Sequence, residues 1–431
     1  MSFDISQFDS DYMYNFIERI IEECGPRMPC SPQEAKSAEI IKTEFEKICD
    51  SSFIEPFTCH PRAFIGYIKV MVVMMFISFI SYFLTILHLT LIIEQIFMGI
   101  SFTLNLGAFL IIWNEFFNYR EFIDPFFKKK ASQNVIGVFE SKKEVKNVLI
   151  FSGHHDSALH FNLLTHLKIG YVIIVLLGLL ILILWMGTST ILFILSIIGF
   201  KIADFLIFQI FALILFVIGV PVLIGLWFFV SFGEKANKVP GAVDNLSAVA
   251  IVLGIGKFLK LNPDIISENT EIRLISFGCE EAGLRGSFRY VEEHHKELKT
   301  KNAICINMDT IQSINNISII DYEPTTRTKH SDDVVKILTQ SAKDLGMPAS
   351  NFSLGGSSFV EKLIGQVTGG TDATAFSKAG LKAASIVAMD LKQMLNFYHQ
   401  PTDTPDKIEK GVLEQVLKLC ITSINYIKNN S

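Results

Sequence analysis

The sequence predicts an α/β domain, built on a mixed, mostly parallel sheet flanked by helices, into which about four transmembrane helices are inserted. Strand-like and helical runs alternate in the polar parts of the chain, as they do in sheet domains. Two apolar blocks interrupt those parts. Hydrophobic residues make up 50% of the 431 residues and charged residues only 19%. Soluble domains carry about 25% charged residues, so the excess of apolar residues must be concentrated in the blocks.

The polar parts are residues 1–62, 115–165 and 234–431, which we expect to supply the N-terminal helices, the first strands and the remainder of one domain. Alternating or short apolar runs predict strands at Val135–Phe139, Val148–Ser152, Ile272–Phe277 and Ala303–Met308. A helical period predicts helices at Asp11–Glu23, Pro32–Cys49, Leu246–Leu261, Leu284–Leu298 and Ile408–Lys428.

The apolar blocks cover residues 63–114 and 166–233. A helix needs about 20 apolar residues to cross the hydrocarbon core of a bilayer. Two spans in the first block, Val70–His88 and Leu91–Trp113, meet this length, and so do stretches that begin at Gly170 and Phe205. The chain is therefore predicted to be a multi-pass integral membrane protein in contact with lipid.

Each block must cross the bilayer an even number of times, because the polar parts can form one domain only on one side. We expect two helices per block, with the short piece Thr190–Phe200 lying at the interface or re-entering. Basic residues flank the spans on the domain side: Arg62, Arg120, Lys128, Lys129, Lys130, Lys168, Lys235 and Lys238. Only Lys201 flanks the other side, so the positive-inside rule predicts a cytoplasmic domain.

Charge and cysteine usage exclude other classes. The formal net charge of -5 argues against a nucleic-acid partner, which normally meets a basic face. Seven scattered cysteines do not resemble the disulfide framework of a small secreted domain, so reduced thiols are expected. The polar, acidic first residues predict that no signal peptide is present.

Acidic and imidazole side chains stand in or beside turns that adjoin apolar strand-like or helical runs. The motifs are FSGHHDSA with His154 and Asp156, PGAVDNLSA with Asp244, ISFGCEEAGLRGS with Glu280 and Glu281, INMDT with Asp309, and NFYHQPTDTPD with His399. Open α/β sheets build their sites at the carboxyl ends of strands, so we expect these side chains to meet there.

These residue types permit a narrow chemistry. Zinc accepts imidazole nitrogen and carboxylate oxygen. Two zinc ions about 3.5–4 Å apart need a bridging carboxylate and two further protein ligands each. Five candidates satisfy that count: His154, Asp244, Glu281, Asp309 and His399. Glu280 is left over, and a spare glutamate beside a metal site can serve as a general base. Each motif alone is weak, since a lone Glu–Glu pair is most often a solvated turn.

With these motifs the sequence resembles the zinc aminopeptidase family that includes bacterial leucyl aminopeptidase, glutamate carboxypeptidase and the transferrin-receptor-like proteins. The matching stretches are GHHDSA, GAVDNLSAVA, FGCEEAGLRGS, NMD, GGTDATAFSKAGL and YHQPTDT, between about residues 134 and 405. The resemblance implies a phosphorylase/hydrolase-like zinc-peptidase fold, two Zn²⁺ per chain and a peptide substrate.

The resemblance also implies roles for single residues. Asp244 would bridge both metals, Glu281 and His399 would complete one site, and His154 and Asp309 the other. Glu280 would be the general base that forms a metal-bridging hydroxide.

Further residues are expected to support the site without binding metal. Asp156 would orient the imidazole of His154, and a cis peptide is expected at Asp244–Asn245. His155 is expected to have a pocket or structural role, and Asp372 to hold a loop near the site.

Several alternatives remain open from the sequence. The leading alternative to an aminopeptidase is a carboxypeptidase or an amidohydrolase that acts on lipid-like amides. A single-zinc glutaminyl cyclase is disfavoured because His154 and Asp309 supply ligands for a second metal. A non-catalytic membrane scaffold is disfavoured because every ligand and Glu280 are present. The oligomeric state is not encoded in any motif.

Overall fold

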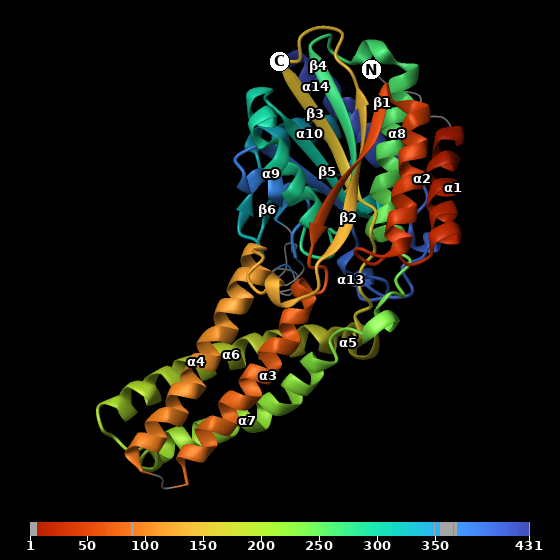
Figure 1. Cartoon of the computed structure of the whole chain (residues 1–431). Coiled ribbons are helices and arrows are strands. Elements are labelled where there is room, and N and C mark those ends of the chain that lie inside the picture. Colours follow the sequence, from red (N-terminus) through yellow and green to blue (C-terminus); the bar gives the residue numbers. More distant parts are fainter. Residues whose placement is uncertain (1–6, 88–89, 349, 354–364, 366–368, 431) are drawn as a thin grey trace. The chain divides into compact units, whose positions relative to one another are not determined.

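The computed structural model describes residues 7–87, 90–348, 350–353, 365 and 369–430. His88, where the first predicted span ends, lies outside them. The chain divides into two compact units (Figure 1). The sheet unit comprises Met1–Pro61, Lys128–His160 and Phe232–Ser431, and the helical unit comprises Arg62–Phe127 and Phe161–Ser231. Residues 115–127, which the sequence placed with the α/β domain, therefore group with the helices.

One mixed sheet forms the centre of the sheet unit. Its strands are β1 (Ser51–Cys59), β2 (Lys130–Phe139), β3 (Asn147–His154), β4 (Thr270–Phe277), β5 (Ile304–Ile311), β6 (Ile317–Glu323), β7 (Thr328–Lys329), β8 (Ser350–Ser353) and β9 (Lys382–Ala388). They lie in the order β1-β2-β4-β3-β5-β9-β6-β7, with β8 also paired to β6.

The central strands β4, β3, β5 and β9 run parallel, and so do β6 and β8. The pairings of β1 with β2, β2 with β4, β6 with β7 and β6 with β9 are antiparallel. The predicted mixed α/β class is confirmed, but half of the pairings among the described strands are antiparallel, so a mostly parallel sheet is not.

Helices cover both faces of this sheet. One face packs against α1 (Gln7–Cys24), α2 (Pro32–Ile48), α8 (Ser247–Leu261), α10 (Asp332–Asp344) and α14 (Val412–Asn430), and the other against α9 (Arg285–Thr300) and α12 (Ala373–Lys378). Successive strand residues point to opposite faces, so Leu149 and Phe151 enter the first core and Val148 and Ile150 the second. The sequence-predicted strands and helices are all found, within a few residues at their ends.

The edge strand β1 was missed by the sequence analysis. Pro56 lies inside it, and proline cannot donate a hydrogen bond to a sheet, so it normally marks the end of a strand. β1 lies at the edge and pairs only with β2, where proline is tolerated.

Among the described residues, the helical unit contains four long apolar helices, α3 (Ala63–Thr85), α4 (Leu91–Asn118), α6 (Ile169–Ile197) and α7 (Leu206–Trp227), and the short α5 (Asn162–Leu167) stands before α6. Aromatic packing joins them, with Phe79 stacked on Trp185 at 4.5 Å between ring centroids. The indole N–H of Trp185 donates to Ser78 Oγ at 2.9 Å. Large apolar side chains also point outward, such as Ile207, which is 75% exposed.

The piece Thr190–Phe200 is not the separate interfacial or re-entrant segment that was expected, because most of it continues α6. The polar stretch before it lowers the hydropathy but does not break the helix. The hydroxyls of Thr188, Ser189 and Thr190 bond back to carbonyls three or four residues earlier, which satisfies them within the helix.

A further apolar segment, Ala242–Leu261, has the length and hydropathy of a membrane span. It contains α8, and 89% of its most apolar stretch is buried, whereas the corresponding stretches of α3, α4, α6 and α7 are only 28–44% buried. A lipid-facing helix exposes its apolar side chains, so α8 is a core helix and the other four are the candidate spans.

Candidate metal centre

The predicted site residues gather at the carboxyl ends of the parallel strands in the sheet unit. His154 is the last residue of β3, and Asp309 lies near the end of β5. Two turns add the others: Glu280 and Glu281 follow β4, and Asp244 lies in the turn Ala242–Leu246 that leads into α8. Neighbouring parallel strands end at the same edge, which is why motifs far apart in the sequence meet here.

Asp244 lies between the two histidines. Its Oδ1 is 3.2 Å from His154 Nε2, and its Oδ2 is 3.3 Å from His399 Nε2. His399, which follows α13 (Leu391–Met394), also has its Nε2 3.3 Å from Glu281 Oε2. Because its two oxygens face different imidazoles, Asp244 separates the site into two halves, as a bridging carboxylate would.

Among the described residues of this site, potential ligand atoms form two overlapping groups that share His154. Those of His154, Asp244 and Glu281 lie within 4.8 Å of one another, and so do those of His154, Glu280 and Asp309. Glu280 Oε2 is 3.6 Å from His154 Nε2. The hydroxyl of Thr310 donates to Asp309 Oδ1 at 2.9 Å and orients that carboxylate.

The carboxyl groups of the site are buried, and burial disfavours their charged form. It raises the pKa of Glu280 and of Glu281 well above the usual range, and that of Asp309 to about 8, with the Asp244 charge adding to the last effect. Burial also opposes ionisation of Asp244, but His154 and His399 outweigh it and hold its pKa well below the usual range.

This donor set fits zinc. Among the described residues, the ion pairs that reach Asp244, Glu280 and Glu281 come only from the two imidazoles, which is little compensation for so many buried carboxylates. Glu281 Oε1 is buried and accepts no hydrogen bond from the described residues. Imidazole nitrogen and carboxylate oxygen without sulfur are ligands that zinc accepts, and a cation there would neutralise the cluster.

Asp156 has more contacts than the predicted one. Its Oδ1 lies 3.4 Å from His154 Nδ1, although the closer contact of that nitrogen, at 3.2 Å, is the main-chain oxygen of Asp156. The carboxylate also accepts the backbone N–H groups of Glu280 and Glu281, each at 3.1 Å. Asp156 therefore fixes the turn that carries both glutamates.

Two supporting residues were missed in the sequence. Asp403, inside the YHQPTDT motif, is fully buried, and its carboxylate accepts the backbone N–H of Val243 at 2.8 Å and of Asp244 at 3.2 Å. Burial raises the pKa of Asp403 to about 8. Arg27, also fully buried, donates from Nε to the carbonyl of His155 at 2.9 Å. Both residues are recognised as supports of the site because they are ionisable side chains that are fully buried. Burial cannot be read from the motif itself.

His155 and Asp372 contribute no atom to either group of ligand atoms. His155 Nδ1 lies 2.9 Å from the Ser276 hydroxyl on β4, and burial lowers its pKa to about 4, so the ring is neutral at neutral pH. Asp372 directly precedes α12 and is fully buried, which raises its pKa to about 7. Its expected role in holding that loop stays a prediction.

The turn before α8 needs unusual backbone geometry. Gly241 has φ 64°, and a Cβ there would lie 2.7 Å from the carbonyl oxygen of Asp244, so a side chain cannot be accommodated. The Asp244–Asn245 peptide is cis, as the resemblance implied. The Asn245 side chain donates to the Met308 carbonyl at 3.0 Å and accepts the Thr310 N–H at 3.3 Å, which ties this turn to β5.

Comparison with known proteins matches a family profile to most of this unit. The sequence profile of peptidase family M28 matches residues 230–424. The matched segment is less than half of the chain, and it contains Glu280 and every predicted metal ligand except His154, which precedes it.

One characterised relative is aminopeptidase YwaD of Bacillus subtilis (strain 168), which is 29% identical over 188 residues. The alignment covers 43% of this chain and 37% of that protein, so the chain matches little more than a third of the relative's length.

Solved structures share the fold. A zinc aminopeptidase from Bacillus subtilis superposes with a TM-score of 0.54 at 14% identity, covering 98% of this chain and 96% of that one. An aminopeptidase from Aneurinibacillus sp. strain AM-1 gives 0.52 at 15%, covering 97% and 93%. A glutaminyl cyclase from Fimbriiglobus ruber gives 0.55 at 12%, covering 98% and 97%. These comparisons agree with the predicted resemblance to zinc aminopeptidases, and the solved structures show that the fold is shared.

Proposed function

We propose that this chain is a membrane-inserted peptidase that holds two zinc ions and removes residues from the amino end of peptides. The observation that carries the proposal is the placement of Asp244 with one carboxylate oxygen toward each imidazole. In this proposal Asp244 bridges two ions, Glu281 and His399 complete one site, and His154 and Asp309 complete the other.

The chemistry at the site follows from its residues. Zinc bound there would lower the pKa of a water and polarise the scissile carbonyl of the substrate. Glu280 accepts a proton from that water and returns it to the leaving amine, because its carboxylate lies beside His154 and is not needed as a ligand. Asp156 keeps Glu280 in place through its backbone N–H. Asp403 does the same for Asp244.

A glutaminyl cyclase is the alternative suggested by the likeness to a solved cyclase structure. The number of zinc ions, two rather than one, distinguishes the proposed peptidase from it. The grouping of His154, Glu280 and Asp309 supports a second metal half. The choice of an aminopeptidase over a carboxypeptidase or an amidohydrolase rests on the 29% identity to YwaD.

Membrane insertion is part of the proposal. The helices α3, α4, α6 and α7 have 22 to 29 residues and expose much of their apolar surface. Each helical insertion also leaves and re-enters the sheet unit at one place. Cys59 at the end of β1 pairs with Lys130 at the start of β2, and the His160 N–H bonds to the Ala236 carbonyl at 2.8 Å. An insertion with adjacent ends requires an even number of membrane crossings. The basic residues that flank the insertions favour a cytoplasmic position for the sheet unit.

The experiment that tests the activity is a digest of a synthetic peptide library by the purified full-length protein in detergent, read by mass spectrometry. We expect stepwise loss of amino-terminal residues, abolished by a zinc chelator and restored by added Zn²⁺, with about two zinc ions per chain. Loss of carboxyl-terminal residues would reassign the enzyme as a carboxypeptidase. Cyclisation of amino-terminal glutamine with about one zinc ion would support a cyclase, and an intact library a scaffold.

A further inference from the structure

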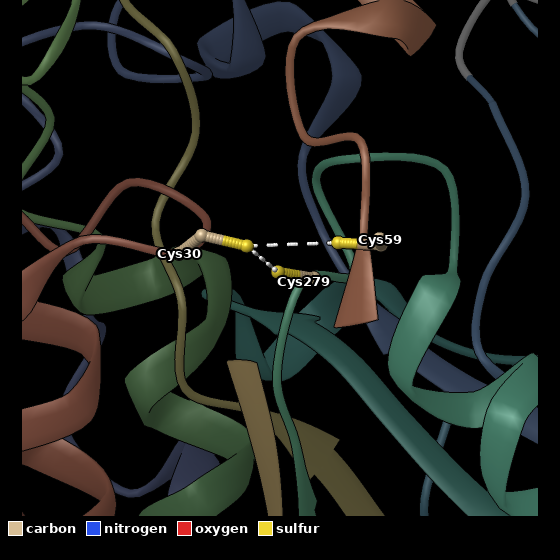
Figure 2. Close-up of side chains that lie close together, drawn as sticks. All are labelled: Cys30, Cys59 and Cys279. Atoms are coloured by element: carbon tan, nitrogen blue, oxygen red, sulfur yellow. Dashed lines mark hydrogen bonds between the residues drawn. The ribbon is translucent and has the colours of Figure 1, made fainter. Parts of the chain in front are cut away.

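Three thiols converge in the sheet unit at a place that the peptidase chemistry does not use (Figure 2). Cys30 lies in the turn between α1 and α2, Cys59 is the last residue of β1, and Cys279 follows β4. The sulfur of Cys30 is 3.6 Å from that of Cys59 and 3.3 Å from that of Cys279, and all three sulfurs lie within 4.8 Å of one another.

The scaffold around the cluster positions these sulfurs. Glu34, fully buried in the first turn of α2, accepts the backbone N–H of Cys30 at 2.7 Å with one oxygen and that of Cys279 at 3.0 Å with the other. The Ser132 hydroxyl donates to the second oxygen at 2.9 Å. Sheet pairing of β1 with β2 places Cys59. Hydrogen bonds and sheet pairing therefore hold the backbone of all three cysteines beside one another.

The separations match a ring of ligands around one ion. A disulfide joins two sulfurs at about 2.05 Å and would leave the third thiol without a role. Thiolates bound to one zinc at about 2.3 Å stand about 3.8 Å apart in a tetrahedron. The two contacts of the Cys30 sulfur, at 3.6 and 3.3 Å, are both shorter than this spacing by at most about 0.5 Å, a difference that small side-chain rotations can supply.

The cluster is chemically distinct from the peptidase centre. That centre offers nitrogen and oxygen, whereas this one offers sulfur, the ligand that soft cations prefer. None of the groups of carboxylate and imidazole ligand atoms found among the described residues includes a cysteine. Cys59 and Cys279 are 1% and 0% exposed, so water would compete poorly for an ion held there.

We propose that Cys30, Cys59 and Cys279 form a second kind of metal site, which binds one thiophilic d10 cation, Zn²⁺ or Cu⁺, through three thiolates. Each thiol releases its proton to solvent as the ion binds, and no oxidation state changes. Cu⁺ needs no further ligand. Zn²⁺ would take a fourth, and Glu34 Oε1, which lies 3.4 Å from Cys279 Sγ, is a carboxylate oxygen beside the cluster.

Such an ion would join three segments that are far apart in the sequence. One of them is the turn that continues into Glu280 and Glu281, so the bound cation would brace the backbone of the peptidase centre from the side. The site itself does not depend on the proposed peptidase activity, and either can fail without the other.

The test uses the full-length protein, purified under reducing conditions and stripped of metal, with Cd²⁺ as the probe. Thiolates bound to Cd²⁺ absorb in the ultraviolet by charge transfer, whereas carboxylate and imidazole ligands do not. We expect a saturable band at about one Cd²⁺ per chain that disappears in Cys30→Ser and Cys59→Ser. Cys49→Ser, which removes a half-buried thiol outside the cluster, and Asp244→Asn, which alters the peptidase centre, should both keep the band.

The same proteins identify the natural ion and supply the contrary outcomes. As purified, the wild-type chain and Cys49→Ser should carry about one more Zn²⁺ or Cu⁺ than Cys59→Ser, with circular dichroism showing that all are folded. A band of equal size in Cys59→Ser would overturn the proposal. So would a metal-free wild-type protein in which alkylation and mass spectrometry find two of the three cysteines joined as a disulfide.

Discussion

At the residue scale, a few carboxylates that each contact two groups hold the site together. Asp244 faces both histidines, and Asp156 and Asp403 accept backbone N–H groups of the segments that carry Glu280, Glu281 and Asp244. Carboxylates that accept backbone N–H groups fix a ligand's position without contacting the metal, and such groups tune metal affinity. The predictions at this scale separate residues that react from residues that position.

Replacing Glu280 by glutamine should remove the proton acceptor while keeping the size of the side chain. General base catalysis contributes about 10²–10⁴-fold, so kcat should fall by about that factor. Zinc content, measured by atomic emission, should stay within error of the wild type because Glu280 is not one of the proposed ligands. Activity near the wild-type level would exclude Glu280 as the base.

Replacing Asp403 by asparagine should weaken zinc binding without removing a ligand. Only one oxygen then remains to accept the N–H groups of Val243 and Asp244, and loss of such a support weakens metal affinity about 10–100-fold. Competition with a chromogenic chelator measures this. Asp406→Asn is the matched control, because Asp406 lies three residues on and pairs with Lys407 at the surface. Equal affinity in both variants would contradict the assigned role.

At the scale of elements, periodicity predicted the helices and the buried strands well. It failed at β1, where Pro56 hides an edge strand, and at α6, where hydroxyl groups lower the hydropathy of a continuous helix. In both places a local signal was overruled by hydrogen bonding that only the folded chain shows. Pairs between elements, such as β4 with α9, were likewise not visible in the sequence.

The ion pair between Arg273 on β4 and Glu297 on α9 should make the free energy of unfolding depend on pH. Partial burial raises the pKa of Glu297, but Arg273 and Lys301 outweigh it and lower the pKa to about 2. The unfolded value is about 4.3, so the ionised form favours the folded state. The contribution, about 1 kcal/mol after discounting for solvent screening, is complete above about pH 5 and is lost as the pH falls toward 2.

Thermal melts of Glu297→Gln against the wild type should therefore show a destabilisation at pH 6 that shrinks toward zero as the pH approaches 2. Glu293→Gln, on the exposed side of the same helix, serves as the control, since the structure shows no ion pair for Glu293 among its described residues. A destabilisation that stays constant with pH would mean that Glu297 acts through packing and not through its charge.

At the scale of the whole molecule, a peptidase sheet is interrupted twice by apolar helices. The first insertion occupies the connection between the paired strands β1 and β2, and the second lies between His160 and Ala236, which share a hydrogen bond. Both interruptions leave the pairing of the sheet intact, which explains how a soluble fold accepts them. The topology they imply is testable without any activity assay.

Single cysteines introduced at Lys129 and Lys201, both exposed, should report opposite sides of the membrane. In sealed vesicles of known orientation, a membrane-impermeant maleimide should label Lys129→Cys from the cytoplasmic side and Lys201→Cys from the other. The wild-type chain, whose own cysteines are buried or half-buried, gives the background. Labelling of both positions from the same side would show that the insertions do not cross the bilayer.

Local patterns in the sequence were sufficient to predict the α/β class and the apolar blocks and to nominate the five ligand candidates and Glu280, because each depends on residue types at fixed spacings, whereas the cis peptide was implied by the family resemblance. The tertiary structure decided what depends on distant segments meeting. It showed that half of the pairings among the described strands are antiparallel. It also showed that α8 is buried whereas the other long apolar helices are exposed. It also placed Asp403 and Arg27 behind the site, and brought together three cysteines separated by up to 249 residues. Burial and the convergence of remote segments are properties of the fold, and no local pattern records them.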